Sequence, residues 1–436
     1  MPEKLTPPVH YRHDNEPAPQ ESTGKTKRVR RAKPEKAEKT LVKASKKFGG
    51  AKLKADWFVT GGIDIPFFAL TIVILAIGLV MLFSASYPYS YFMRGNSYHY
   101  FIRQFVFAVF GVALMLFVSK LNFKIFKAAA PYLLGITLLL LIIVLFYHTS
   151  ISTDEGEAFK RYIKVPGLPL TFQPSDIAKF TLVTTLATYI SMFSREMKTF
   201  KYGILIPAVI IGVYCLLIMA ENHLSGTIIV GVIGLSLMFA GGTNKKIFII
   251  GVALLAAVVL VVLMFPDILP KYIQTKLQAF SDKDFEPLGA RWQTNNSLYA
   301  IGSGGLFGVG LGNSKQKFLY VSQPQNDFIF SIVCEELGFV GAVVIILLFA
   351  ALVIRGFIIA LRSPDKFAAL TVVGIMVQVG VQVGFNILVV TDSIPNTGIA
   401  LPFFSYGGTA LVMLLFEMGV VLGISRKANQ RKVIEE

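Results

Sequence analysis

Ten long runs of apolar residues, separated by short polar segments, occupy most of the chain after its first sixty residues. Each run provides about the twenty residues that an α-helix needs to cross a bilayer core of ~30 Å. The pattern predicts an all-α polytopic membrane protein with ten transmembrane helices. The predicted helices cover residues 65–86, 101–119, 128–148, 176–193, 202–220, 225–242, 246–266, 328–354, 367–391 and 403–424.

Basic residues in the short loops predict the orientation of these helices. Lys and Arg are enriched in cytoplasmic loops, and here every second loop is basic: Lys120, Lys124 and Lys127; Arg195, Lys198 and Lys201; Lys245 and Lys246; Arg355, Arg362 and Lys366. An even number of spans then places the N- and C-termini together in the cytoplasm. The four remaining polar segments are predicted to lie outside, at residues 87–100, 149–175, 267–327 and 392–402.

The third of these segments forms a large predicted extracellular loop between helices 7 and 8. It covers residues 267–327, which is long for a loop between membrane helices. Two of its pieces, residues 271–280 and 293–302, have the composition of short amphipathic helices that lie on a surface.

Composition supports the membrane assignment and sets the two ends of the chain apart. The 436 residues are 54% hydrophobic and only 16% charged, whereas soluble domains carry about 25% charge. Residues 1–56 contain fifteen Lys and Arg against seven Asp and Glu, and they lack the apolar residues that a core requires. We therefore expect a disordered basic cytoplasmic tail over residues 1–60, a membrane domain over 61–425, and a short cytoplasmic tail over 426–436.

The charge of the N-terminal tail has two interpretations. One is a topogenic signal that is also attracted to the anionic headgroups of the lipid bilayer; the other is a binding segment for a cytoplasmic protein. No nucleic acid partner is expected, because no folded surface would present these charges. The two cysteines, Cys215 and Cys334, lie inside apolar runs and indicate neither a disulfide framework nor a thiolate metal site.

Asp327 is the first candidate for chemistry, because a carboxylate at the mouth of a membrane helix is costly unless it is solvated or functional. Its charge would gain about 0.3–1 kcal/mol from the helix dipole. As a metal ligand it would need oxygen-rich partners that the nearby sequence lacks, and as a general base it would deprotonate a hydroxyl. Glu335 and Glu336, about 12 Å deeper on the same helix, are expected to face the bundle interior, paired or protonated.

Six glycines between Gly302 and Gly312 precede Asp327. Glycine permits positive φ and a close approach of the backbone to a ligand, but a tight surface loop also needs it. Gln316 and Lys317 follow the glycines directly and are candidates for substrate binding.

A second candidate segment surrounds Asp176. Ser175 is predicted to cap a helix and Asp176 to lie in its first turn, three residues before Lys179, with which it can pair. The pair either lets charged residues enter the membrane edge or, with Arg161 and Lys164, forms a cationic site for a phosphate or pyrophosphate.

The last candidate segment, residues 386–408, is interrupted by Pro395, Pro402 and paired glycines. Non-helical backbone at membrane depth is tolerated where it lines a wet cavity or is buried in protein. Ser405 and Tyr406 would line such a cavity, or the segment forms a simple re-entrant turn.

Four segments together resemble the signature motifs of the SEDS family, the FtsW, RodA and SpoVE proteins of bacterial cell-wall synthesis. They are FQPSDIAK at 172–179, AIGSGGLFGVGLGNSKQK at 300–317, DFIFSIVCEELG at 327–338 and PNTGIALPFFSYGG at 395–408. The resemblance extends from about residue 60 to 425. It implies a peptidoglycan glycosyltransferase that polymerises lipid II on the outer face of the bacterial cytoplasmic membrane and releases undecaprenyl diphosphate.

The resemblance also implies partners and roles. The partners are a cognate class B penicillin-binding protein, which is a transpeptidase, and other divisome proteins. Asp327 matches the family's essential aspartate, Asp176 and Lys179 match an acidic and basic pair, and Arg161 matches the arginine of an RW motif. With Gln316, Lys317 and Ser405 they make up the predicted site; no cofactor is required, although the pyrophosphate could bring a divalent cation, Mg or Mn.

The chain departs from the family pattern at His223, where an aspartate is usual, at Asp392, where a small residue is usual, and in the VSQPQN segment before Asp327. Within the family, the long basic tail favours an FtsW-like division protein over RodA-like elongation or SpoVE-like sporulation polymerases. Two rival functions are a lipid II flippase and a scaffold that only recruits the transpeptidase. Polar residues concentrated in the outer half of the spans favour surface chemistry over translocation.

Overall fold

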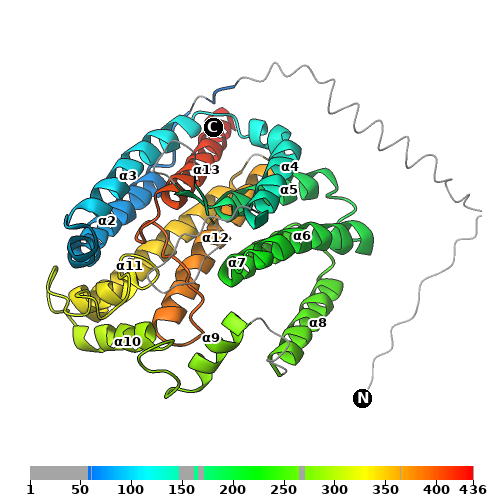
Figure 1. Cartoon of the computed structure of the whole chain (residues 1–436). Helices are drawn as coiled ribbons and strands as arrows, with labels where there is room; N and C mark the ends of the chain where they lie inside the picture. Colours follow the sequence, from blue (N-terminus) through cyan, green and yellow to red (C-terminus); the bar gives the residue numbers. More distant parts are fainter. Residues whose placement is uncertain are drawn as a thin grey trace, which may run out of the picture. The chain divides into compact units, whose positions relative to one another are not determined.

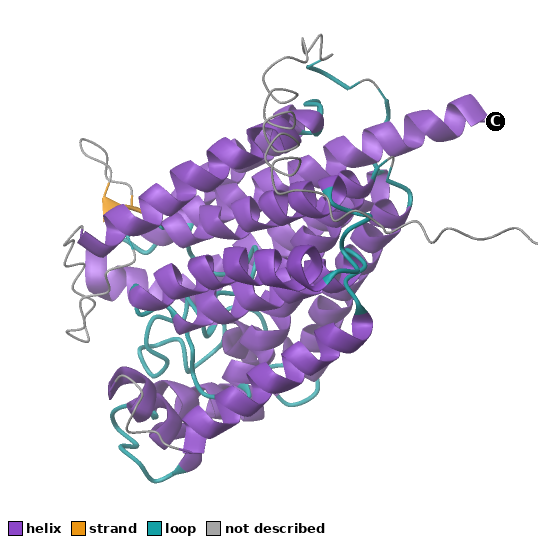
Figure 2. Cartoon of the chain, turned by 90° about the vertical axis from the view of Figure 1, so that its right-hand side faces the viewer, coloured by secondary structure: helices purple, strands orange, loops and turns teal. Residues whose placement is uncertain are grey.

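The computed structural model describes residues 57–59, 61–146, 162–164, 171–264, 271–363 and 365–435. These residues are helical almost throughout (Figures 1 and 2), apart from loops and one antiparallel pair of short strands, β1 Ile163–Lys164 and β2 Thr171–Phe172. Most of the predicted N-terminal tail, and the candidate Arg161, lie outside the described residues.

Each of the ten apolar runs contains a helix, although the last helix begins at Gly408 and not at residue 403 as predicted. The helices are α2 Ile65–Arg94, α3 His99–Val118, α4 Lys124–Phe146, α5 Pro174–Met192, α6 Ile206–Ala220 with the preceding π-helical turn η1 Lys201–Leu205, α7 Leu224–Ala240, α8 Lys245–Met264, α11 Ile329–Leu361, α12 Lys366–Val390 and α13 Gly408–Glu435. Seven of the described helices are long and apolar enough to cross a membrane: α2, α3, α4, η1 with α6, α11, α12 and α13. The protein is therefore a multi-pass membrane protein, and the crossing of all ten helices stays a prediction.

The two short helices expected in the long loop are also present. They are α9 Lys271–Ser281 and α10 Trp292–Gly304. α10 does more than lie on a surface: it packs against α11, and the Ser297 hydroxyl donates a hydrogen bond to the carbonyl of Val390 at the end of α12 (2.9 Å). This packing fixes the loop to the helices beneath it.

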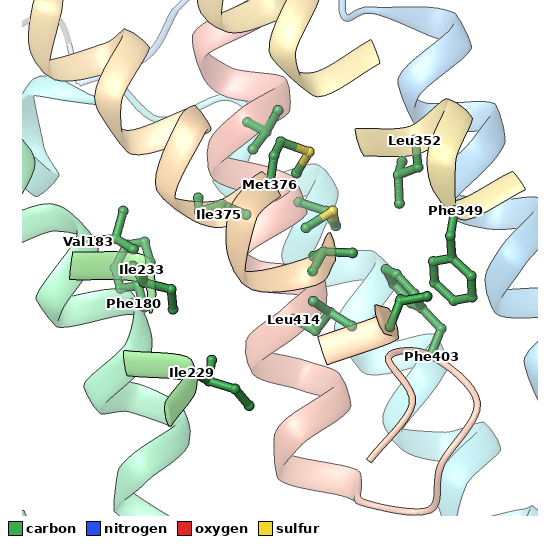
Figure 3. Packing of buried hydrophobic residues seen from close by; sticks show 14 of the residues in the cluster. Phe180, Val183, Ile229, Ile233, Phe349, Leu352, Ile375, Met376, Phe403 and Leu414 are labelled. Atoms are coloured by element: carbon green, nitrogen blue, oxygen red, sulfur yellow. The ribbon is translucent and has the colours of Figure 1, made fainter. Parts of the chain in front are cut away.

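α5 and α12 form the centre of the packing. α5 contacts α4, α7 and α12, and it is buried on almost every side although many of its residues are polar. Figure 3 shows Phe180 and Val183 of α5, Ile233 of α7 and Ile375 of α12 among the buried side chains. Because α5 is held on so many sides, its first turn has a fixed position.

α11 is broken at Gly338, where φ is 68° and ψ is −170°, whereas the hydrophobic pattern predicts one uninterrupted helix over 328–354. The backbone groups freed by the break bond to the glycine-rich loop. The N–H of Val309 donates to the carbonyl of Glu335 (3.0 Å), and the N–H of Phe339 donates to the carbonyl of Gly305 (2.9 Å). A β-carbon on Gly308 would lie 2.2 Å from the Glu336 carbonyl oxygen, so at this position glycine allows a close approach to the backbone of α11.

Glu335 and Glu336 hold the same loop from the side. Both are 1% exposed, so the prediction that they face the interior is confirmed. The backbone N–H of Lys315 donates to Glu335 Oε1 (2.8 Å). Glu336 accepts from the hydroxyl of Ser84 in α2 (2.7 Å) and pairs with Lys317 (Nζ to Oε1, 2.8 Å). The two carboxylates therefore anchor the loop to α11 and α2.

Candidate active site

One cavity of about 1720 Å³ brings together candidate residues that lie far apart in the sequence. Asp327, Asp176, Lys179 and Ser405 all line it, and so does Tyr406. Its walls include residues of α3, α5, α7, α9, α10, α12 and α13 and of the loops that precede α11 and α13. The three polar segments that carry these residues thus meet in one place.

Asp327 lies two residues before α11, and its backbone is held firmly. Its carbonyl accepts a hydrogen bond from the Asn386 side chain of α12 (Nδ2 to O, 2.7 Å), and the same amide donates to the carbonyl of Ile399 (2.6 Å). The carboxylate is half-buried and lies against Gly398, where a β-carbon would be 3.0 Å from Oδ2. Gly398 has φ of 67°, so glycine is favoured there by both the backbone and the space.

Ser405 joins the last loop to the residues before α11. Its hydroxyl accepts from the N–H of Leu401 (2.8 Å) and donates to the carbonyl of Asn326 (2.9 Å). The side chain of Gln104 in α3 holds the next residues: Nε2 donates to the Ser405 carbonyl (3.2 Å), and Oε1 accepts from the N–H of Gly407 (3.1 Å). Ser405 lines the cavity, but its hydroxyl proton is already used within the protein.

The first turn of α5 contributes the ion pair of Asp176 and Lys179. Lys179 Nζ lies 2.8 Å from Asp176 Oδ1, and each side chain is 12% exposed. Asp176 lies in the first turn as predicted, but Ser175 is not the N-cap, because the helix begins at Pro174 and Gln173 is the cap. Proline favours the first helical position since it has no N–H to satisfy and its φ is fixed.

Glu417 and Gln378 line the same cavity and are not among the site residues predicted from the sequence. Gln378 Nε2 of α12 donates to Glu417 Oε2 of α13 (2.8 Å), and both side chains are almost fully buried. Glu417 is also close enough to Lys179 and Asp176 to interact with their charges. The sequence does contain a signal for Glu417, because an acidic residue in the middle of the predicted helix 403–424 is as unusual at membrane depth as Glu335.

Two predicted substrate-binding residues, Gln316 and Lys317, are not among the residues that line the cavity. Lys317 is 3% exposed, and its Nζ bonds to Glu336, to the Ser84 hydroxyl and to the carbonyl of Gly312. The structure thus corrects the expectation for Lys317: its charge compensates a buried carboxylate of the protein and does not face the cavity.

Comparison with known proteins identifies the family. The model of the FtsW, RodA and SpoVE family, described as cell cycle proteins, matches residues 65–430. The chain belongs to this family. The resemblance seen in the sequence motifs is therefore confirmed.

Several members of the FtsW, RodA and SpoVE family are similar over nearly their whole length. Stage V sporulation protein E of Bacillus subtilis is 36% identical over 364 residues, which cover 83% of this chain and 97% of that protein. The probable peptidoglycan glycosyltransferase FtsW of Trichlorobacter lovleyi is 32% identical over 366 residues, 83% of this chain and 93% of the relative.

Solved structures of the family share the fold. A chain from a peptidoglycan synthase complex, in work on the structural coordination of polymerization and crosslinking, superposes with a TM-score of 0.68 at 26% identity, covering 85% of this chain and 99% of that one. The rod shape determining protein RodA of Thermus thermophilus gives a TM-score of 0.60 at 26% identity, covering 84% and 97%.

Two positions at which this family member departs from the usual pattern have defined surroundings. His223 caps α7 without a capping hydrogen bond from its side chain, and its Nδ1 lies 3.2 Å from the Ser175 hydroxyl. Asp392, two residues after the end of α12, pairs with Arg291, the residue before α10 (Nη2 to Oδ2, 2.7 Å). Both His223 and Asp392 line the cavity.

Proposed function

We propose that this protein is a peptidoglycan glycosyltransferase that polymerises lipid II into glycan strands at the outer face of the cytoplasmic membrane during cell division. The observation that carries the proposal is the single cavity in which Asp327 meets the Asp176–Lys179 pair. Relatives named probable peptidoglycan glycosyltransferase FtsW support the assignment.

Asp327 is the proposed general base. It would take the proton of the 4-hydroxyl of the acceptor sugar while that oxygen forms a bond to the anomeric carbon of the donor chain. The bond from the anomeric carbon to undecaprenyl diphosphate breaks in the same step, and the leaving group keeps the electron pair. General base catalysis typically contributes 10²–10⁴-fold, and the anchored backbone of Asp327 supports it because the carboxylate needs little reorganisation.

Asp176, Lys179 and Ser405 are the proposed substrate-binding residues in the described part of the cavity. Lys179 would stabilise the negative charge that develops on the leaving diphosphate. Lys179 is already paired with Asp176, so a further cation is needed, and Arg161 stays the predicted source.

A divalent cation, Mg or Mn, stays a prediction. Among the described residues no group of three or more His, Cys, Asp and Glu side chains could hold a metal ion. The substrate diphosphate would therefore have to supply most of the ligands of the ion.

The proposed topology has ten transmembrane helices, both termini in the cytoplasm, and the extracellular loop 267–327 between helices 7 and 8. The membrane domain then extends over residues 61–425, between a cytoplasmic tail over 1–60 and a second over 426–436. The predicted cytoplasmic loops supply the support, since each of them is basic.

The proposed partners, besides lipid II and the lipid bilayer, are a cognate class B penicillin-binding protein and other divisome proteins. The neighbour taken from a peptidoglycan synthase complex supports the first of them. A sporulation polymerase is the second candidate function, because stage V sporulation protein E is 36% identical. A fluorescent fusion that localises to division septa of growing cells would favour the division role, and one seen only at sporulation septa would favour the second.

The test of the enzyme activity is Asp327→Asn in the full chain with its cognate transpeptidase, supplied with purified lipid II. We expect polymerisation to fall at least about 100-fold. Asp365→Asn is the matched control, because Asp365 caps α12 through the Ala368 N–H (2.8 Å) and asparagine caps equally well. Full polymerisation by the Asp327 variant would refute the assigned base.

A further inference from the structure

One guanidinium joins three segments at the cavity. Arg291, the residue before α10, donates from Nη2 to Asp392 Oδ2 (2.7 Å) and from Nη1 to the carbonyl of Ala279 in α9. The side chains of Arg291 and Asp392 are 4% and 13% exposed. Solvent and salt screen a buried ion pair only weakly, so this contact is less sensitive to ionic strength than a surface ion pair.

The two segments to which Arg291 bonds, α9 and the chain after α12, both form walls of the cavity. In α9, Lys276 and Ala279 line the cavity. After α12, the chain runs from Asp392 through the cavity-lining residues 396–398 to Gly398, against which the Asp327 carboxylate lies. The ion pair is thus connected to the proposed base through the short backbone segment that ends at Gly398.

Asp392 itself is held in an uncommon conformation. It follows α12 with φ of 53°, the left-handed region that Asp and Asn enter more readily than other residues with a β-carbon. The backbone therefore turns at Asp392, and the turn directs the following residues along the cavity. A pair that fixes Asp392 also fixes the direction in which residues 393–398 leave α12.

We propose that Arg291 is a positioning residue for the polymerisation step. Its ion pair with Asp392, the Arg291–Asp392 clamp, joins the segment 392–398 to Arg291, and the bond from Arg291 to the Ala279 carbonyl joins Arg291 to α9. Together these contacts fix the backbone against which the Asp327 carboxylate rests. The proposal rests on the function proposed above and adds residues whose role is geometric, since neither side chain has to touch the reacting atoms.

The energetics of buried ion pairs favour this role over simple stabilisation. The desolvation of two buried charges offsets most of their attraction, so apolar side chains of similar volume often stabilise a protein as well or better. Arg291 also leaves its Nε without a hydrogen-bond partner among the described residues, which lowers the stabilising value of the pair further. What the pair supplies is a defined distance between two walls of the cavity, and a displacement of about 1 Å at a catalytic group can lower a rate roughly 100-fold.

The test compares Asp392→Asn, Arg291→Gln and the double variant, each in the full chain with its cognate transpeptidase and purified lipid II. Asparagine keeps the shape of Asp392 and tolerates its positive φ. The matched control is Asp64→Asn, which breaks the Asp64–Arg355 pair (2.8 Å) and retains a residue that can cap α2. Asp64 and Arg355 are not among the residues that line the cavity.

Each single clamp variant is expected to lower kcat roughly 10–100-fold at saturating lipid II, per folded protein. The control is expected to lower the melting temperature and leave kcat unchanged. The double variant leaves no buried charge unpaired, so its melting temperature should recover while its kcat stays low. If the ion pair only stabilised the fold, the kcat of the double variant would recover together with its melting temperature.

Hydrogen exchange provides a readout that does not depend on activity. The amides of α9 should exchange faster in Asp392→Asn than in the wild type, and should be unchanged in Asp64→Asn. Unchanged α9 exchange, or a kcat within about twofold of wild type, would overturn the clamp. A wild-type chain that polymerises no lipid II would refute the proposed function instead, and the exchange comparison would still decide whether the clamp exists.

Discussion

The contact between the glycine-rich loop and the break in α11 makes Gly308→Ala the most informative stability variant. Gly308 has φ of 80°, and a β-carbon there would lie 2.2 Å from the Glu336 carbonyl oxygen and 2.7 Å from the N atom of Gly338. These are backbone atoms, so no side chain can rotate away. The loop would have to move and lose the bonds from Val309 and Gly310 to the carbonyls of Glu335 and Glu336.

The expected loss of stability is the sum of two effects. Placing alanine in the left-handed region costs about 1–2 kcal/mol. Two backbone hydrogen bonds left unmade cost about 1–3 kcal/mol each where water cannot replace them. We therefore expect Gly308→Ala to lower the free energy of unfolding by about 3–8 kcal/mol.

Gly312→Ala separates the two effects. Gly312 has nearly the same φ, 83°, but no atom lies within 4 Å of its β-carbon position, so it should lose only the conformational part, about 1–2 kcal/mol. Equilibrium denaturant unfolding of both variants in micelles gives the difference. Equal losses for the two variants would show that the loop is not fixed to α11 as described.

Two further predictions concern buried polar contacts. Lys317→Met should destabilise the protein by about 3–5 kcal/mol, because Glu336 is left as an unpaired buried charge. Adding Glu336→Gln should recover most of this loss in the same unfolding assay. A double variant as unstable as Lys317→Met would contradict the ion pair. Ser405→Ala should lower the free energy of unfolding by about 1–3 kcal/mol, because the hydrogen bonds to Leu401 and Asn326 are lost. The glycan yield per folded protein should fall as well. An unchanged melting temperature would show that these bonds contribute nothing to stability.

The helices could be predicted because their signal is local. A run of about twenty apolar residues by itself has one way to satisfy its backbone in a bilayer, which is to form a helix, and each predicted run contains a helix. The pieces that form α9 and α10 carry a similar local pattern. The pairing of Asp176 with Lys179 was predictable for the same reason, since residues three apart lie on one helix face.

Errors arose where a residue's role depends on a distant partner. Lys317 looked available for substrate, yet its charge is paired with Glu336 of α11. Its Nζ also bonds to Ser84 of α2, which is far away in the sequence. The glycines looked suited to a ligand, but two of them, Gly304 and Gly308, approach the backbone of α11. The break itself was invisible in the hydrophobic pattern, because apolar residues continue on both sides of Gly338 and predict one helix over 328–354.

The sequence alone determined the membrane character, the helices and the family, because hydropathy and motif spacing are local properties of the chain. It also determined that Asp327 needed an explanation, since a carboxylate at a helix mouth is unusual wherever it occurs. Only the tertiary structure decided which polar residues meet. It brought Asp327, Asp176 and Lys179 into one cavity, and it joined Gln378 to Glu417 and Arg291 to Asp392. Those contacts depend on how the helices pack, and no pattern within a single segment contains that information.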